Sequence, residues 1–195
     1  MSKEIWFCSD LHLGHSNMYK FTNYDGTKCR PWDNYEEAEE YMLQEFNKVL
    51  KPNDTLYILG DVASRTDRAS YFFNSLVPCR RILLMGNHDN KIGFKFLSKY
   101  FNEIRGAYNL ENYIMTHIPV SSGSKGRFKR NLHGHTHNNI ITIDNNGKIP
   151  DPWYRNVCVE RTGFKLINFS EIKKETEKLI EKGIIVIPKK GERIV

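Results

Sequence analysis

The amino-acid sequence predicts an α/β sandwich with functional loops at the carboxyl ends of its strands. In the first part of the chain, short β-rich apolar runs alternate with stretches of helical apolar spacing, which favours parallel strands joined by helices. Several strand-like runs then follow one another, which favours a second, mixed part of the fold. Aspartate, histidine, asparagine and glycine gather directly after the predicted strands, where open α/β sheets carry their functional loops.

The first part of the chain contains three predicted strands and three predicted helices. The strands are runs of mainly apolar residues at 5–9, 55–59 and 81–85. The helices are predicted over 35–50, 67–76 and 92–100. Asp33 or Asn34 is placed to cap the first helix, because a short polar side chain accepts a hydrogen bond from the first free backbone amides.

The second part is predicted to be richer in strands. The runs that predict them lie at 104–108, 113–116, 128–132, 140–143, 157–159 and 184–187. A charged helix is expected over 171–182, capped by Ser170 and ended by Gly183, before a basic tail with Lys189, Lys190 and Arg193. We expect one domain over 1–195, with a motif core at 5–140 and C-terminal strands, helix and tail at 155–195.

Composition narrows the class of protein. The formal net charge is +6, which fits a polyanionic partner such as nucleic acid, or a small phosphorylated substrate. No apolar run approaches the roughly 18 residues that span a bilayer, so we expect no membrane association and a cytoplasmic location. The 4 cysteines are widely spaced, which favours buried free thiols over disulfides or a zinc–thiolate site.

All 7 histidines lie in four short stretches, at 10–15, 86–89, 116–117 and 133–137. Each stretch follows a predicted strand and also carries aspartate, asparagine, glycine or threonine. A fifth stretch at 60–62 has the same form without histidine. Histidines that serve only packing would not gather at strand ends beside such residues. The clustering therefore predicts a metalloenzyme.

The residue types in these stretches suit borderline-hard divalent ions, which prefer oxygen and imidazole ligands to thiolate. Asp10 and His12 alternate along a segment expected to be extended, so both would reach one ion from the same side. Asp61 stands alone after its strand, placed to bridge two ions. The candidate ligands are Asp10, His12, Asp61, Asn87, His117, His135 and His137.

A centre of two divalent ions is the kind of catalytic site that needs so many ligands. Two ions roughly 3.5–4 Å apart clamp a phosphoryl oxygen, generate hydroxide from a bridging water and stabilise in-line displacement. One histidine must stay off the metals to protonate the leaving group, and His88 is the best candidate. Asp89 is expected to orient His88 by accepting its other ring proton.

The ordered series Asp-x-His, Gly-Asp, Gly-Asn-His-Asp, a lone His and Gly-His-x-His spans residues 10–137. It resembles the calcineurin-like metallophosphoesterase superfamily. The opening motif and the Arg30-Pro31-Trp32 segment resemble a small bacterial and phage subgroup of predicted phosphoesterases, which for a phage protein implies the host cytoplasm. The resemblance implies the metallo-dependent phosphatase fold, a four-layer sandwich of two mixed β-sheets flanked by helices.

The resemblance also implies a role for each motif residue. Asp10, His12, Asp61 and His137 would hold a first divalent ion. Asp61, Asn87, His117 and His135 would hold a second, and His88 would be the leaving-group acid. Manganese is the expected metal, with iron, zinc or nickel as alternatives.

Several residues outside the motif positions are candidate substrate contacts. His15, Asn17 and Arg30 follow the first motif, on a loop beside the expected centre. Lys125 and Arg127 lie on a basic loop that could close over a substrate phosphate. The alternatives are a supporting or surface imidazole at His15 and a solvated hairpin for the basic loop. His133 is interpreted as a structural strand-end residue.

The leading functional hypothesis is a phosphoesterase with two metal ions that hydrolyses a phosphodiester or phosphomonoester by attack of metal-bound hydroxide. A phosphorylated small molecule or nucleotide fits the compact chain. A nuclease or polynucleotide phosphatase is the alternative that fits the positive charge. The hypothesis from another class is a catalytically silent scaffold or binding protein with the same fold.

Overall fold

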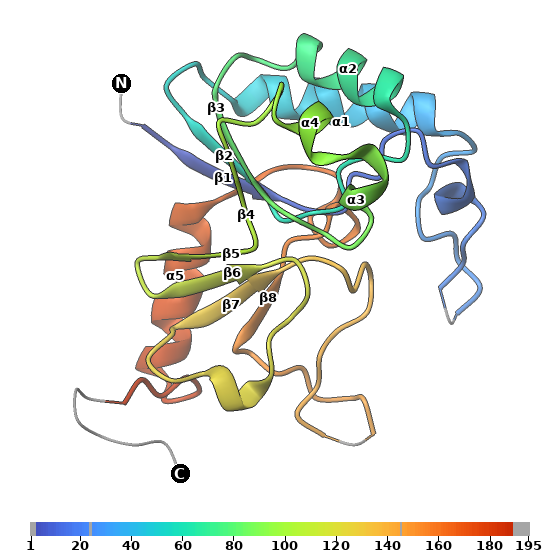
Figure 1. Ribbon diagram of the computed structural model, residues 1–195. Coiled ribbons are helices and arrows are strands. Elements are labelled where there is room, and N and C mark those ends of the chain that lie inside the picture. Colours follow the sequence, from blue (N-terminus) through green and yellow to red (C-terminus); the bar gives the residue numbers. More distant parts are fainter. Residues whose placement is uncertain (1–2, 24, 145, 189–195) are drawn as a thin grey trace.

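Two mixed β-sheets flanked by helices form the protein (Figure 1), as the sequence predicts. The structure is a computed structural model that describes residues 3–23, 25–144 and 146–188. The predicted basic tail with Lys189, Lys190 and Arg193 lies outside the described residues. In the part of the chain that the structure describes, none of the helices combines the length and apolar character that crossing a bilayer requires.

The larger sheet has the strand order β4-β3-β2-β1-β9. Its parallel strands are β1 (Ile5–Cys8), β2 (Thr55–Ile58), β3 (Arg80–Leu84) and β4 (Glu103–Arg105). The edge strand β9 (Ile167–Asn168) pairs antiparallel with β1. Because β1, β2 and β3 run the same way, the loops that follow them meet at one edge of the sheet.

The smaller sheet has the strand order β5-β6-β7-β8. Its strands are β5 (Ala107–Leu110), β6 (Tyr113–Thr116), β7 (Arg130–His133) and β8 (Tyr154–Asn156). Strand β5 is antiparallel to β6, whereas β6, β7 and β8 are parallel. The loops after β6 and β7 therefore leave at the same end of this sheet.

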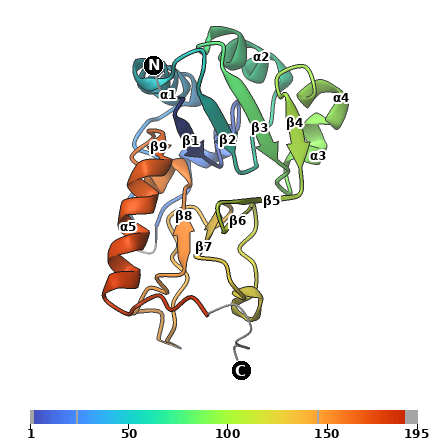
Figure 2. The same ribbon diagram turned by 90° about the vertical axis from the view of Figure 1, so that its left-hand side faces the viewer.

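Helices cover the larger sheet and one side of the sandwich. The long helices are α1 (Tyr35–Val49), α2 (Thr66–Ser75) and α5 (Phe169–Glu181). Helices α1 and α2 pack on the larger sheet, and α5 runs alongside both sheets (Figure 2). The short helices are α3 (Asp89–Ile92), α4 (Phe94–Leu97), η1 (Ser16–Tyr19), η2 (Ser122–Ser124) and η3 (Val159–Arg161).

Two apolar cores hold these layers together. Phe46, Phe72 and Leu83 belong to the core between the larger sheet and its helices. Phe7 and Leu132 belong to the core between the two sheets, which α5 also joins. Burying one such side chain contributes about 1.5–3 kcal/mol. The strand ends are therefore fixed by rigid packing on both faces of the larger sheet.

The local expectations are confirmed in most of the first part, including the cap of α1 by Asn34. The helix expected over 92–100 is instead two short helices, because Gly93 adopts a φ of 86° between them. The strand expected over 104–108 is divided between β4 and β5, which lie in different sheets.

The second part departs further from expectation. No strand forms at 140–143 beyond one isolated bridge from Thr142 to Pro150, and none forms at 184–187. The strand expected over 157–159 lies earlier, as β8, and β9 was not expected. Asn168 rather than Ser170 caps α5, because its side chain accepts from the Ser170 amide. Short apolar runs cannot reveal which of them find a strand partner.

Candidate metal centre

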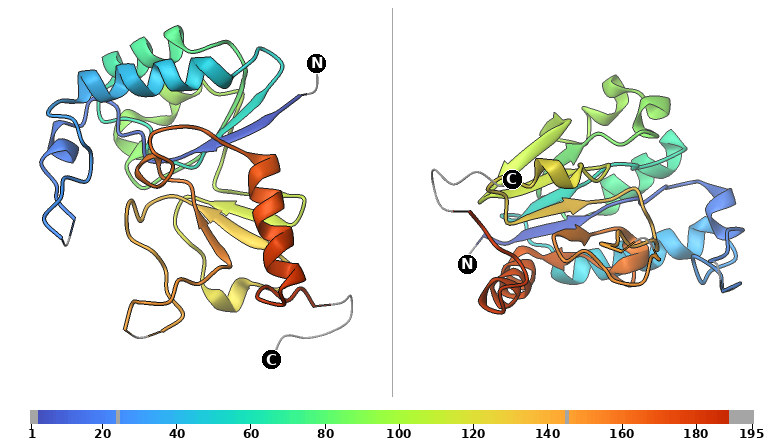
Figure 3. Two further views of the ribbon diagram at one scale, coloured as in Figure 1. Left: turned by 180° about the vertical axis from the view of Figure 1, so that it is seen from behind. Right: turned by 90° about the horizontal axis from the view of Figure 1, so that it is seen from below.

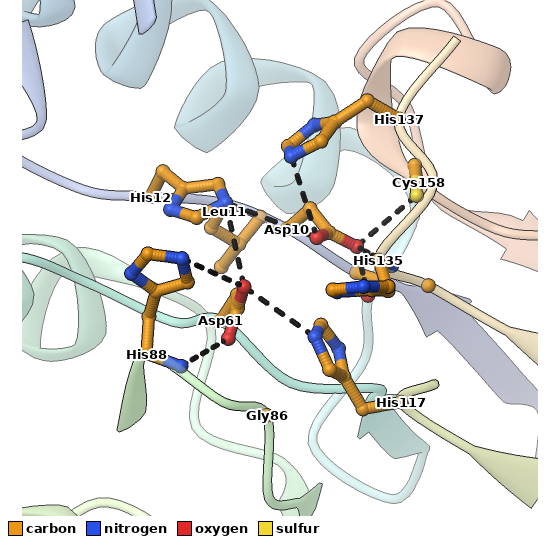
Figure 4. A network of polar contacts seen from close by, with 12 residues as sticks. Asp10, Leu11, His12, Asp61, Gly86, His88, His117, His135, His137 and Cys158 are labelled. Atoms are coloured by element: carbon orange, nitrogen blue, oxygen red, sulfur yellow. Dashed lines mark hydrogen bonds and ion pairs between the residues drawn. The ribbon is translucent and has the colours of Figure 1, made fainter. Parts of the chain in front are cut away.

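The histidine-containing stretches meet at the carboxyl ends of parallel strands from both sheets (Figure 4). Each stretch follows its own strand, and all seven predicted ligands come together there. Six of them form two groups whose ligand atoms lie within 4.8 Å of one another: Asp10, His12 and His137, and Asp61, His117 and His135. The seventh, Asn87, joins the second group, because its Oδ1 lies 2.9 Å from Nε2 of His117.

Asp61 lies between the two groups. Its Oδ2 is 3.6 Å from Nε2 of His12 and 3.4 Å from Nε2 of His117. Its Oδ1 accepts a hydrogen bond of 2.8 Å from the His88 backbone amide, which fixes the orientation of the carboxylate. Burial acts to raise the pKa of Asp61, but the hydrogen bond and charge of His117 lower it to about 2. Asp61 is therefore ionised at neutral pH.

One oxygen of the Asp10 carboxylate accepts hydrogen bonds from the chain, and the other faces the centre. Its Oδ2 accepts hydrogen bonds from the His135 amide (2.9 Å), from Sγ of Cys158 (3.1 Å) and from the Ser9 hydroxyl. Its Oδ1 is buried and has no hydrogen-bond donor among the described residues. This free oxygen lies 3.8 Å from Nε2 of both His12 and His137.

Hydrogen bonds set the protonation of two histidine rings. Nδ1 of His117 lies 2.7 Å from the Leu59 carbonyl, and Nδ1 of His137 lies 3.0 Å from a carboxylate oxygen of Glu160. Both partners can only accept, so each Nδ1 carries the proton. With the proton on Nδ1, a neutral ring leaves its Nε2 lone pair available to a metal ion, as in histidine ligands held by a carboxylate or carbonyl.

These atoms fit divalent cations. Both ring nitrogens of His12 and Oδ1 of Asp10 are buried with no hydrogen-bond partner within the described chain. Buried polar atoms in proteins are otherwise paired, so this cluster requires a group that the chain itself does not supply. The two groups offer imidazole nitrogen and carboxylate oxygen, and Asn87 adds an amide oxygen. Such ligands suit divalent ions of borderline hardness rather than a soft thiolate site.

The backbone at the centre is strained. Five predicted ligands adopt left-handed φ angles: Asp10 (60°), His12 (50°), Asp61 (54°), His135 (70°) and His137 (48°). The expectation that Asp10 and His12 alternate along an extended segment is therefore wrong. Tight left-handed turns aim these side chains instead. Such conformations cost on the order of 1–3 kcal/mol each and persist where surrounding structure holds them, commonly at functional sites.

Two glycines permit the close approach of these turns. A Cβ on Gly134 would lie 1.9 Å from the Ser9 hydroxyl and 2.5 Å from Oδ2 of Asp10. A Cβ on Gly86 would lie 2.2 Å from Oδ1 of Asp61. Close packing therefore explains why glycine precedes both Asn87 and His135, because any side chain there would displace an acidic residue of the centre.

Arg30 does not line a substrate pocket as expected, because its side chain is fully buried. It donates to the backbone carbonyls of Asp10 (2.6 Å) and Leu11 (2.9 Å) and pairs with Glu160 at 2.7 Å. Burial acts to raise the pKa of Glu160, but the Arg30 charge and the His137 hydrogen bond lower it to about 2. Arg30 and Glu160 therefore support the strained Asp10 turn and the His137 ring together.

Glu160 was not predicted as a functional residue. It lies 23 positions from His137 and 130 from Arg30, so no local spacing connects the three.

Asp89 does not orient the His88 ring as expected. Its buried carboxylate accepts hydrogen bonds from the backbone amides of Gly86 (2.7 Å), Val62 (2.8 Å) and Asp61 (3.1 Å). Asp89 therefore ties the loop after β3 to the loop after β2. The His88 ring is half-buried, with Nε2 4.0 Å from Oδ2 of Asp61, and packs edge-on against His12.

The expected substrate contacts separate into two sets. His15 packs edge-on against His12 at 5.7 Å between ring centroids, and Asn17 is exposed on η1 nearby. Lys125 and Arg127 instead precede β7, at the end opposite to His135. Lys125 pairs with Asp151 at 3.1 Å, so the basic loop does not close over the centre. His133 is buried and its Nδ1 donates to the Gly134 carbonyl, as a structural residue at a strand end would.

Two hollows flank the centre. A hollow of about 480 Å³ lies beside His137, where Asn23 and Asn138 join by a hydrogen bond of 2.9 Å. Its lining residues come from the loop after β7 and from Thr22, Asn23 and Cys29. The segment that follows β1 and contains η1 projects from the rest of the molecule (Figure 3). A second hollow of about 370 Å³ lies beside Asn87 and His117. Each candidate metal group thus adjoins open space for a substrate.

Comparison with known proteins gives consistent matches. The protein-family model described as calcineurin-like phosphoesterase matches residues 3–184. An uncharacterized protein of Methanocaldococcus jannaschii is 30% identical over 187 residues, which covers 94% of this chain and 95% of that protein. The gene 66 protein of Mycobacterium phage L5 is 26% identical over 134 residues, covering 67% of this chain and 58% of that protein. A solved structure of a protein of unknown function from Aquifex aeolicus shares 25% identity with a TM-score of 0.64, covering 89% of this chain and 99% of that one.

Proposed function

Because the chain belongs to the calcineurin-like phosphoesterase family, we propose that it hydrolyses phosphate esters with two divalent metal ions. Asp10, His12, Asp61 and His137 would hold the first ion, and Asp61, Asn87, His117 and His135 the second. Mn(II) is the expected ion, with Fe, Zn or Ni as alternatives. The observation that carries this proposal is the position of Asp61 Oδ2, which lies within 3.6 Å of a ring nitrogen from each group.

When bound, two such ions polarise the phosphoryl group and activate a water for in-line attack. The chain's own residues prepare the rest. The Nδ1 hydrogen bonds of His117 and His137 hold both Nε2 atoms toward the centre. His88 carries no role in this ligand set and is half-buried beside it, so its ring is placed to donate a proton to the leaving oxygen. His15 and Asn17 are the candidate substrate contacts that remain.

A phosphodiester fits the surroundings of the centre better than a monoester. A diester carries two organic groups on its phosphorus, and one hollow adjoins each metal group. The larger hollow contains the amide side chains of Asn23 and Asn138, which can pair with polar groups of a nucleoside. We therefore favour a small diester such as a dinucleotide or cyclic nucleotide.

Two phosphodiesters with different leaving groups test this proposal. With Mn(II), the wild type should hydrolyse both a nitrophenyl diester and a dinucleotide. His88→Asn should lose about 10²–10⁴-fold in rate on the dinucleotide, whose alkoxide must be protonated. It should lose far less on the nitrophenyl diester, whose leaving group is a weak base. Equal losses on both esters would remove His88 from the proton-donor role.

The alternatives give different results in the same assay. A silent scaffold would bind metal but hydrolyse none of the esters. A nuclease would prefer DNA or RNA to the small diesters, with a rate that falls steeply as salt increases. Asp61→Asn is the control for metal dependence, because it removes charge from the shared carboxylate while retaining its shape.

A further inference from the structure

A third hollow, with an unusual charge, lies outside the candidate metal centre. It has a volume of about 440 Å³ and is bounded by β7, β8 and the segments on either side of them. Three arginines line it, Arg130, Arg155 and Arg161, with Glu175 of α5. Asp151 also borders this hollow but is already paired with Lys125 at 3.1 Å. Glu175 is therefore the carboxylate that remains to balance three guanidinium groups.

Arg130 is the central feature of this hollow. Its residue is 5% exposed, and its Nε has no hydrogen-bond acceptor among the described residues. The rest of its guanidinium reaches the Tyr154 carbonyl at 3.1 Å and Glu175 at 3.3 Å. Burial lowers the pKa of Arg130, and the neighbouring Arg155 lowers it further. A buried, incompletely paired cation is costly unless an anion completes its hydrogen bonds.

Glu175 cannot complete them alone. Its side chain is 45% exposed and is shared with Arg155, whose Nε lies 3.0 Å from Oε2 and whose Nη2 donates to Oε1 at 3.2 Å. Arg161 is exposed, with no ion pair in the described chain. Three positive charges against one negative charge leave a surplus of about two, which matches a phosphate group with its charge of about −1.5 to −2 at pH 7. The arginine fork also matches phosphate oxygens geometrically.

The remaining walls indicate a ligand with an organic part. Ile140, Ile141, Pro150 and Pro152 border the same hollow and offer apolar contact. Its volume lies in the range of about 300–1,000 Å³ that small-molecule sites occupy. We infer that this hollow binds the phosphate group of a small organic molecule, at a site separate from the candidate metal centre.

The hollow and the metal centre share one supporting residue. Asn156 borders the hollow and donates to the carbonyl of His137 and to the Thr136 hydroxyl, both at 2.8 Å. A ligand in the hollow therefore lies against the residue that holds the backbone of a candidate metal ligand. This inference does not depend on the proposed hydrolysis, because it concerns binding alone.

Calorimetric titration of the full chain tests it. Inorganic phosphate and a nucleoside monophosphate are titrated in EDTA, so that no divalent ion at the metal centre binds phosphate, and again with Mn(II). We expect one phosphate per chain in EDTA, bound at least about tenfold more weakly by Arg155→Gln/Arg161→Gln. Arg127→Gln, an exposed arginine outside the hollow, is the matched control and should bind as the wild type does.

The outcomes separate the possible ligands. Tighter binding of the nucleoside monophosphate than of phosphate supports an organic phosphate, and equal binding supports free phosphate as the source. Binding that survives in the double variant would overturn the inference. A single-stranded oligonucleotide is the third probe. Binding of the oligonucleotide without binding of either small probe would also overturn the inference, and would assign the arginines to a polymer.

Discussion

Replacing the buried Glu160 by glutamine is the sharpest test of how the protein supports its centre. The side chains of Glu160 and Arg30 are 1% and 0% exposed, and their charged atoms lie 2.7 Å apart. Glu160→Gln retains the shape but leaves the Arg30 charge without its partner. Breaking a buried pair in this way costs about 3–5 kcal/mol. We therefore expect the free energy of unfolding to fall by about that amount.

The same change should weaken metal binding selectively. Glu160 accepts from Nδ1 of His137, and loss of such a supporting partner lowers metal affinity by about 10–100-fold. His117 depends on the Leu59 carbonyl instead, so the second ion should remain bound. Urea unfolding measures the first effect, and calorimetric titration with Mn(II) measures the second.

Glu103→Gln is the matched control, because Glu103 pairs with arginine as Glu160 does but is 24% exposed. Exposed pairs contribute about 0.2–1 kcal/mol, so this variant should differ little from the wild type. A Glu160→Gln protein that is as stable as Glu103→Gln and binds both ions with wild-type affinity would refute this role of Glu160.

Three further predictions address the glycines, the pH dependence and the basic loop. Gly134→Ala should lower stability by about 1–3 kcal/mol and reduce metal content, since its Cβ would meet Ser9 and Asp10. Gly106→Ala has open space at its Cβ and should change neither quantity. Thermal unfolding and metal analysis measure the two effects. Burial lowers the pKa of His133 from 6.5 to about 4, so between these values the unfolded chain binds the extra proton. The free energy of unfolding in EDTA should therefore rise with pH across this window, by about 3 kcal/mol for this histidine. His133→Gln should show a smaller rise. An unchanged pH dependence in His133→Gln would contradict the lowered pKa of His133. Lys125→Ala and Arg127→Ala should keep diester hydrolysis within about twofold, and a large loss would restore the basic loop to the site.

The sequence was sufficient to predict which residues meet, because each motif directly follows a strand and parallel strands end at one edge. The sequence was not sufficient to predict the backbone turns and supporting side chains that bring these residues together. Left-handed turns at Asp10 and Asp61 depend on surrounding packing rather than on local propensity. Glu160 is joined to Arg30 and His137 only by the tertiary fold, so neither its role nor the burial of Arg30 could be predicted. Strand partners were equally hidden, as 140–143 and β9 illustrate.

We propose that Asp61 joins two metal sites in one centre. Metal analysis of the protein after saturation with Mn(II) and removal of excess ion tests it most directly. We expect two ions per chain in the wild type, and fewer than two in Asp61→Asn with the fold retained. A wild-type protein that binds one ion or none, or an Asp61→Asn protein that keeps both with unchanged affinity, would contradict it.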